Sequence, residues 1–381
     1  MKRGDLAVAA AVAGVAALAV PETLGLGFAD DDFFQIRWVA NHSFVEILSS
    51  PETWRGLPMR LLTPGLFLSL KVDHALGGWA SDGYRLHQLL AWAVLAGLLY
   101  LVLRLFHRPV DALGGSAVAL LGPAVTGLVP LLMVRHYVEG LALTLLAIGL
   151  FVLAVRRRRE THPRSPPSPV SAISLLSAFA YAGAALAKEV FVPLPLVLIA
   201  LPVGSWRQRV RLAIPHAVCL VAYPLYRRFL LGEWLGGYGL APDPGDLPAL
   251  WSTLPLRLLG QAGEPGGVLG GILVAAAMTA LLGVLVRTRS SRLLTAAVAI
   301  GCLAPLLPAA ASLSPRLAAV PWVGLAMAIP SLLSGLSRGP RAAAWTFVGG
   351  LALATHLVAD VRTTESMSGA GWSPENPLPR V

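Results

Sequence analysis

The sequence predicts an all-α, polytopic membrane protein, and two observations support this fold class. Hydrophobic residues make up 56% of the 381 residues and charged residues only 13%, about half the charged share of a soluble domain. Apolar runs of roughly 15 to 22 residues recur along the whole chain, close to the length of helix that crosses a bilayer. No stretch is left for a soluble domain, so we expect residues 1–360 to form a single transmembrane domain.

About eleven membrane-spanning helices are expected from these runs. The first follows Met1-Lys2-Arg3 and is similar to a signal peptide, but we interpret it as a retained anchor because further spans follow it. The span at 190–204 is the weakest, since it is short and broken by prolines. In chain order the spans lie at 6–26, 86–106, 112–133, 137–155, 170–187, 190–204, 212–230, 267–286, 293–311, 317–336 and 342–360.

The positions of arginine and lysine predict the orientation, because basic loops stay in the cytoplasm. With a cytoplasmic N-terminus, the inner loops and flanks hold 17 basic residues and three acids, against 13 basic residues and 17 acids outside. Only the Arg227-Arg228 cluster then lies outside, together with the tail at 361–381. We therefore expect a multi-pass protein of the plasma (inner) membrane, and we attribute the net charge of +10 to topology rather than to nucleic-acid binding.

Two loops on the outer side are long, at residues 27–85 and 231–266. Segments of the first loop, such as "NHSFVEILSS", have the apolar spacing of helices that lie in the membrane interface. Aromatic residues, which favour this interface, recur along the same loop at Phe33, Phe34, Trp38, Trp54 and Trp79. We expect the first loop to be partly ordered on the membrane.

Ionisable residues collect at the outer mouth of the predicted bundle, although charge beside hydrocarbon is costly. Four separate turns contribute them at one depth, which favours a functional site there. The residues are Asp30, Asp31 and Asp32 after the first span, Arg135, His136 and Glu139 between the third and fourth, Lys188 and Glu189 between the fifth and sixth, and Arg316 at the start of the tenth.

Each of these groups also has a purely structural interpretation. Three adjacent carboxylates at 30–32 raise one another's pKa unless a cation or a donor relieves them, which suits a general base or a metal site but also a solvated loop start. Lys188 and Glu189 would otherwise be an interfacial ion pair with a snorkelling lysine. Arg316 is planar and permanently charged, which suits phosphate, but a lone arginine at a helix end is often an interface anchor.

The order of these features resembles the lipid-linked-sugar glycosyltransferases of the GT-C fold, in particular the protein O-mannosyltransferase-like and tetratricopeptide-fused mannosyltransferase group. The resemblance covers roughly residues 20–335. It departs from the family at Gln88 and Trp92, where members commonly carry Asn and His, and only 361–381 follow the last span. The similar segments are "FADDDFF", "GYRLHQLLAWAVLAGLLYLVLRLF", "ALLGPAVTGLVPLLMVRHYVEGLALTLLAIGLFVLA", "ALAKEVFVPLPLVL" and "SPRLAAVPWVGLAMAI".

This resemblance implies an inverting glycosyltransferase that moves a sugar from a polyprenyl-phosphate donor to an acceptor on the outer face of the membrane. Asp31 would be the catalytic base, with Asp32 orienting it or sharing a divalent metal with it; no cofactor is required by the sequence. Lys188 and Arg316 would hold the donor phosphate, and Glu189 would pair with Lys188 or meet the acceptor. The sugar and the acceptor, whether glycan, lipid or protein, stay open. Supporting roles fall to Arg135, Glu139 and Asp30.

Two other classes of function stay open. A transporter or lipid flippase would be expected to carry ionisable residues or broken helices near the bilayer midplane and an internal repeat, whereas the charges here lie at the outer edge. A non-catalytic membrane assembly partner would use the acidic residues structurally. Donor-cleavage and transport assays separate these classes.

Overall fold

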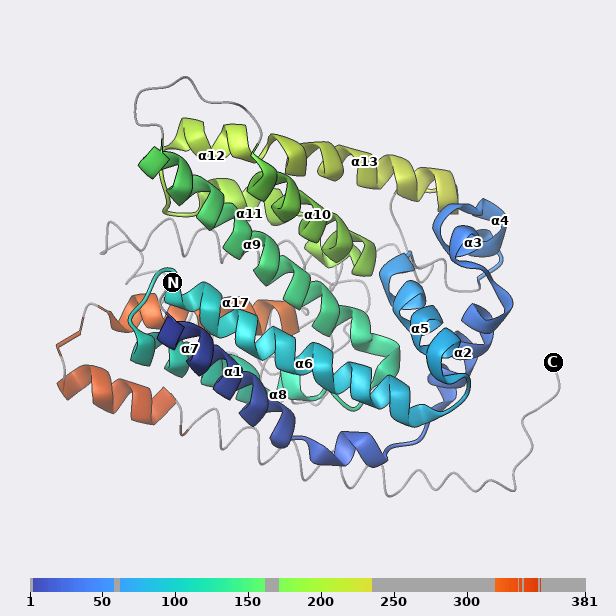
Figure 1. Ribbon diagram of the computed structural model, residues 1–381, viewed down its shortest axis with the longest axis horizontal. Coiled ribbons are helices and arrows are strands. Elements are labelled where there is room, and N and C mark those ends of the chain that lie inside the picture. Colours follow the sequence, from blue (N-terminus) through green and yellow to red (C-terminus); the bar gives the residue numbers. More distant parts are fainter. Residues whose placement is uncertain are drawn as a thin grey trace, which may run out of the picture.

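A computed structural model (Figure 1) describes residues 3–57, 62–161, 171–234 and 319–350, the last range with gaps at 335, 338 and 349. Every regular element within these ranges is helical, which confirms the predicted all-α class. Several predicted features lie wholly or largely outside the described residues: the spans 267–286, 293–311 and 342–360, the loop 231–266, the tail 361–381 and Arg316.

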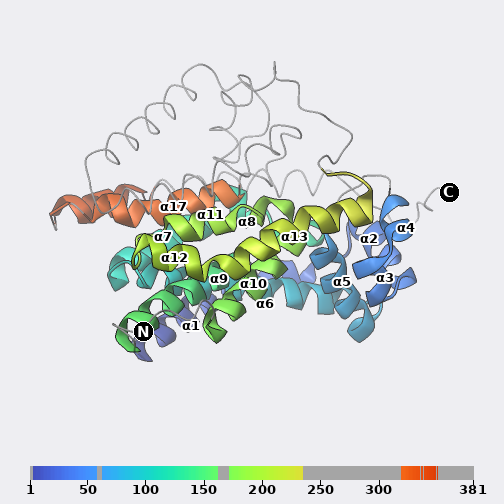
Figure 2. The same ribbon diagram turned by 90° about the horizontal axis from the view of Figure 1, so that it is seen from above.

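Four helices form the centre of the bundle: α1 (Arg3–Leu18), α6 (Ser81–Arg104), α9 (Arg135–Thr161) and α10 (Ala172–Ala187). Helix α6 lies between α1 and α9, and α10 packs against α9 and runs antiparallel to it (Figure 1). On another side of this centre, α7 (Pro109–Leu121) and α17 (Ala319–Leu333) pack together, as Figure 2 shows.

Among the described residues, two helices are long and apolar enough to cross a membrane, Ser81–Arg104 and Leu132–Arg157. Shorter apolar helices occupy other predicted spans, so the number of spans stays a prediction. Proline shortens them, because it removes a backbone donor and clashes with the preceding turn. The predicted span 112–133, for example, is divided into α7, α8 (Pro123–Thr126) and the 3₁₀ turn η2 (Leu132–Val134).

The weakest predicted span, 190–204, contains the turn η3 (Glu189–Phe191) and the short helix α11 (Leu194–Ala200). It leads back to the end of the bundle at which α10 begins. There the Ser174 hydroxyl of α10 donates to the Leu212 carbonyl, 2.9 Å away, at the end of α12 (Trp206–Leu212). The broken segment therefore covers the same length of the bundle as α10. It continues through α12 into α13 (Ile214–Leu231).

The first long loop folds into four helices that cover one end of the bundle, on the right in Figure 1. We call this end the loop end. Trp54 is fully buried between Trp38 and Phe67, with ring centroids 5.6 and 5.5 Å away. Some aromatic residues expected in the membrane interface therefore form a small core instead, whereas Phe34 and Trp79 are exposed. The four helices are α2 (Asp30–Asn41), α3 (Phe44–Ser49), α4 (Pro51–Arg55) and α5 (Pro64–Gly77).

Candidate active site

The ionisable residues from three of the four predicted turns lie at the loop end (Figure 1). The first residues of α2, α6 and α9 and the last residues of α10 meet there. Helix α5 approaches α10 so closely that a Cβ atom on Gly65 would lie 2.8 Å from the Cα of Ala187. The start of α5 therefore borders Lys188, the next residue after Ala187.

Asp32 is a buried carboxylate whose two oxygens are both engaged. Oδ2 accepts a hydrogen bond from the backbone N–H of Ala29 at 3.0 Å and so caps α2, while Oδ1 accepts one from the N–H of Met133 at 3.0 Å. The guanidinium of Arg85 lies 3.7 Å from Oδ2. Burial raises the pKa of Asp32, and the two N–H donors and Arg85 oppose this rise only in part. A metal ion here would have to displace these donors.

Arg85, in the first turns of α6, is also buried, and the sequence analysis missed its role. Its guanidinium donates to the carbonyls of Leu26 at 3.2 Å and Pro130 at 2.5 Å, and also to that of Gly27. It therefore ties the segment after α1 to the segment before α9. The only sequence signal was an arginine directly before a predicted span, where a charge beside hydrocarbon needs a partner.

Asp31 differs from its neighbour because its side chain is exposed. It makes no hydrogen bond or ion pair to the described residues, so its carboxylate is available to a ligand. The side chain of Asp30 lies outside what the structure describes. Within the described ranges, no group of three or more His, Cys, Asp or Glu side chains is arranged to hold a metal ion.

Arg135, the first residue of α9, is completely buried and is the hub of a polar network. All of its donor groups are used within the protein, so it serves as a structural residue rather than as a ligand for substrate. Its partners come from α5 and α6: Asp73, the Tyr84 carbonyl at 2.5 Å, Ser69 Oγ at 3.2 Å and Gln88 Oε1 at 3.2 Å.

The same network contains His87, which the sequence analysis did not single out. Its Nδ1 lies 2.7 Å from Asp73 Oδ1, and its Nε2 lies 3.5 Å from Glu139 Oε1. Glu139 also accepts a hydrogen bond from the Ser69 hydroxyl at 2.6 Å. Glu139 thus lies close to Arg135, as the sequence suggested, but it contacts His87 and Ser69. A buried arginine requires a counter-ion, and this was the one signal that could have led to Asp73.

Lys188 follows the last residue of α10 and is 5% exposed. Its ammonium lies 3.6 Å from Glu189 Oε1, beyond hydrogen-bond length, and it donates no hydrogen bond to the described residues. The other carboxylate oxygen of Glu189 is buried without a hydrogen-bond partner. The predicted Lys188–Glu189 ion pair is therefore present, but its two charged groups are too far apart for a hydrogen bond.

Helix α13 brings a second cation towards Glu189. The Tyr223 hydroxyl lies within electrostatic reach of both Glu189 and Arg227. Arg227 is 5% exposed and belongs to the one arginine cluster that violated the predicted charge asymmetry. Its buried position beside Tyr223 explains why it departs from that pattern.

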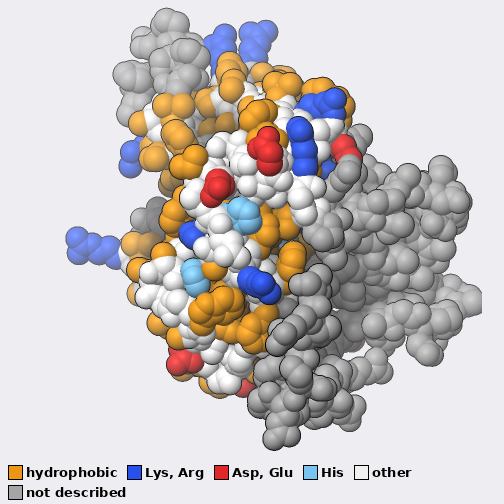
Figure 3. Space-filling view, turned by 90° about the vertical axis from the view of Figure 1, so that its right-hand side faces the viewer, with side chains coloured by type: hydrophobic (Ala, Val, Ile, Leu, Met, Phe, Trp, Pro, Cys, Tyr) orange, Lys and Arg blue, Asp and Glu red, His pale blue; other side chains and the backbone are white. Residues whose placement is uncertain are grey.

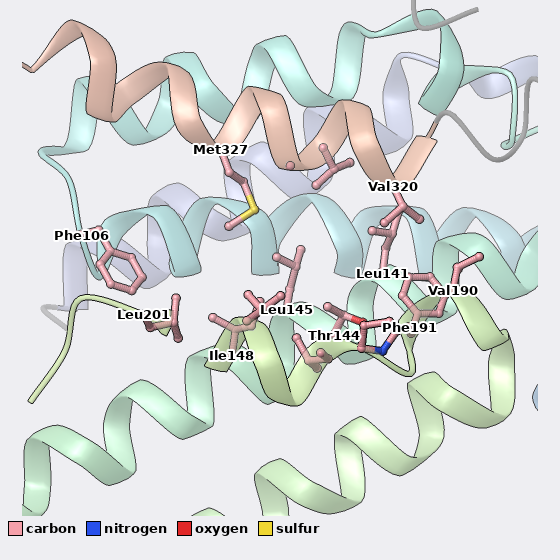
Figure 4. A pocket seen from close by; sticks show the side chains of 15 residues that line it. Phe106, Leu141, Thr144, Leu145, Ile148, Val190, Phe191, Leu201, Val320 and Met327 are labelled. Carbon is pink, nitrogen blue, oxygen red and sulfur yellow. The ribbon is translucent and has the colours of Figure 1, made fainter. Parts of the chain in front are cut away.

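An apolar cavity of about 90 Å³ is lined by residues of α9, η3, α11 and α17 (Figure 4). Val190 and Phe191, which follow Glu189 in the chain, line one side of it. Leu145 of α9, Leu194 of α11 and Met327 of α17 line the rest, and most of the surface is hydrocarbon. The segment that directly follows Lys188 and Glu189 therefore borders a cavity whose lining suits an alkyl or prenyl chain.

The helical bundle and its two long apolar helices indicate a helical membrane protein. One similar solved structure is that of ArnT from Cupriavidus metallidurans bound to undecaprenyl phosphate, with a TM-score of 0.51 and 16% sequence identity over 98% of this chain and 67% of that chain. At this identity the likeness shows the fold. No protein family matches the sequence, and no curated protein is similar to it.

Proposed function

We propose that this protein is a glycosyltransferase that moves a sugar from a polyprenyl-phosphate donor to an acceptor on the outer face of the membrane, with inversion at the sugar C1. The observation that carries this proposal is the buried Lys188 ammonium, which lacks a hydrogen-bond partner among the described residues and lies two residues before the segment that lines an apolar cavity.

Burying an ammonium is costly unless an anion accepts its hydrogen bonds. A phosphate would supply those acceptors, and its prenyl chain would extend along the apolar cavity. An amphiphile with an anionic head is therefore the ligand class that fits both features. The GT-C-like fold, shared with a protein solved with undecaprenyl phosphate, supports the same ligand class.

Two arginines are proposed to complete the phosphate site. Arg227 lies buried on α13 near Glu189. Arg316 precedes α17 by three residues, and Val320 in the first turn of α17 lines the cavity. Arg316 itself lies outside the described residues, and its role at the phosphate is proposed from the sequence. Permanently charged guanidinium groups suit the planar, bidentate recognition of phosphate.

In the proposed reaction, the Asp31 carboxylate removes the proton from an acceptor hydroxyl. The acceptor oxygen then attacks the sugar C1, and the bond between C1 and the phosphate oxygen breaks. The electron pair stays on the phosphate, which Lys188 stabilises. The exposed and unpartnered carboxylate of Asp31 supports this role, whereas Asp32 is engaged in its own helix cap and in the turn before α9.

The test uses the full chain purified in nanodiscs. Binding of undecaprenyl phosphate and cleavage of a panel of radiolabelled polyprenyl-phosphate sugars are measured for the wild type, Lys188→Gln and Arg37→Gln. Arg37 is exposed on α2 at the same end of the bundle. Arg37→Gln therefore removes one positive charge, as Lys188→Gln does, and serves as its control.

We expect binding and cleavage to fall in Lys188→Gln and to persist in Arg37→Gln. Undiminished lipid binding by Lys188→Gln would contradict the phosphate site. Movement of the lipid across a bilayer without cleavage would identify a transporter instead.

A further inference from the structure

With His87 neutral, the network around it holds two carboxylates, Asp73 and Glu139, and one cation, Arg135. The Asp73 carboxylate is neutralised by the buried Arg135 guanidinium, with which it pairs directly. Glu139 has no comparable cation of its own, because Arg135 donates its hydrogen bonds to Asp73, Ser69, Gln88 and Tyr84. One carboxylate therefore remains beside the imidazole ring.

The geometry assigns the proton on the imidazole. His87 Nδ1 lies 2.7 Å from the acceptor Asp73 Oδ1 and 3.3 Å from the Arg135 guanidinium, so the shorter contact places the hydrogen on Nδ1. In the neutral ring Nε2 is then an acceptor, and it faces Glu139 Oε1 at 3.5 Å. Two acceptors that face each other need a donor between or beside them, and the Ser69 hydroxyl donates only to Glu139.

This pair of acceptors opens onto an apolar surface. The His87 side chain is 36% exposed and that of Glu139 is 17% exposed. Three exposed residues, Leu86, Leu90 and Val94, form a stripe along α6 beside His87, at the four-residue spacing of one helix face. Val72 and Leu76 of α5 extend the exposed apolar surface at the loop end, where Figure 3 shows histidine and carboxylate side chains near hydrophobic patches.

We propose that His87 and Glu139 bind the primary ammonium of an ethanolamine-type lipid headgroup. The ammonium offers N–H donors to both acceptors and supplies the missing positive charge. The acyl chains of the same lipid lie along the exposed stripe of α6. A choline headgroup carries the charge but no N–H donor, and a glycerol headgroup carries no cation. This site is separate from the proposed sugar transfer and does not depend on it.

The experiment measures which lipids the full chain retains. Protein is reconstituted in nanodiscs that contain equal amounts of phosphatidylethanolamine, phosphatidylcholine and phosphatidylglycerol with identical acyl chains, and retained lipids are counted by native mass spectrometry. Two variants are chosen to keep the fold. His87→Asn retains a donor for Asp73, and Glu139→Gln retains an acceptor for Ser69. Asp82→Asn, on the exposed first turn of α6, is the control that also removes one negative charge.

The wild type and Asp82→Asn should retain phosphatidylethanolamine over phosphatidylcholine by roughly tenfold, the effect of one net hydrogen bond to a charged group. The preference should disappear in His87→Asn and Glu139→Gln. Equal retention of the two lipids by the wild type, or an unchanged preference in both variants, would overturn the proposal. Displacement of the lipid by equimolar glycerophosphoethanolamine would overturn the lipid assignment, because the headgroup alone would then suffice.

Discussion

The carboxylate of Asp32 lies 3.7 Å from the guanidinium of Arg85, and both side chains are almost completely buried. Asp32 also holds the turn before α9 through Met133, while Arg85 holds the segment after α1 through Leu26. One ion pair thus joins the segment after α1 and the turn before α9 to the start of α6 at the loop end. The acidic residue closest to the proposed base is therefore part of the scaffold that positions it.

Asp32→Asn is expected to lower the stability of the protein. Asparagine can still accept one of the two backbone hydrogen bonds, but it leaves one buried N–H donor unpaired and Arg85 without its counter-ion. The loss should be about 1 to 3 kcal/mol, the usual cost of an unsatisfied buried group. Thermal unfolding in detergent measures it, with the exposed Asp31→Asn as the control that should unfold like the wild type. Equal unfolding temperatures for all three proteins would contradict the scaffold role.

The stability contributed by Asp32 should also depend on pH. Burial raises its pKa above the ordinary value of 3.8, so the folded protein binds this proton more tightly than the unfolded chain does. The stabilisation that comes from this tighter proton binding is fully present below pH 3.8. It is lost as the pH rises through the raised pKa of Asp32. The asparagine side chain of Asp32→Asn is uncharged at every pH. As the pH rises through this window, the Tm of the variant should therefore fall less than that of the wild type. A steeper fall in the variant would contradict the direction of the shift.

Asp31→Asn should abolish most transfer without affecting the fold. The amide keeps the volume of the carboxylate but cannot accept a proton, so turnover should fall about 100- to 10,000-fold while expression and donor binding persist. Transfer of a radiolabelled sugar, or donor hydrolysis, is measured at matched protein levels. Asp30→Asn should matter least of the three acidic positions. Near-normal turnover by Asp31→Asn would remove it as the base.

The sequence predicted the all-α class because apolar periodicity and composition are local properties. It also predicted that ionisable residues from separate turns gather at one end, since the lengths of the apolar runs decide which turns meet. It assigned different roles to Asp31 and Asp32 only through the family resemblance, because no local pattern shows which of the two carboxylates is engaged by the protein. That distinction depends on Met133, a hundred residues away, which donates to one carboxylate and not to the other.

The same limit applies to Arg135 and Lys188. Both appeared in charged turns beside a span, yet Arg135 has its donors satisfied by Asp73, Ser69 and Gln88, whereas the Lys188 ammonium is left without a hydrogen bond to the described residues. Partners on other helices decide which charge is structural and which is available. The local pattern of the sequence does not contain this information.

This difference predicts opposite effects of removing the two charges. Arg135→Gln should destabilise the protein by about 3 to 5 kcal/mol, because Asp73 would be buried without its cation. Arg135→Lys should not restore the loss, since an ammonium cannot reproduce the fork of donors. Lys188→Gln should leave the unfolding temperature close to that of the wild type. The comparison is made by thermal unfolding, and a stable Arg135→Gln protein would show that the network is dispensable.

The end of the bundle opposite the loop end should face the cytoplasm. The acids described there are neutralised, because Asp5 lies 2.9 Å from Arg104 and Asp111 lies 3.7 Å from Arg341, so the remaining arginines leave this end strongly positive. In a background with Cys219 and Cys302 replaced, a membrane-impermeant thiol reagent applied to intact cells should miss Ser168→Cys in the linker before α10. It should label Ser368→Cys in the tail if the chain crosses the membrane eleven times, and both sites should react once the cells are permeabilised. Labelling of Ser168→Cys in intact cells would place the basic end outside, and it would turn the loop end, with Asp31 and Lys188, towards the cytoplasm.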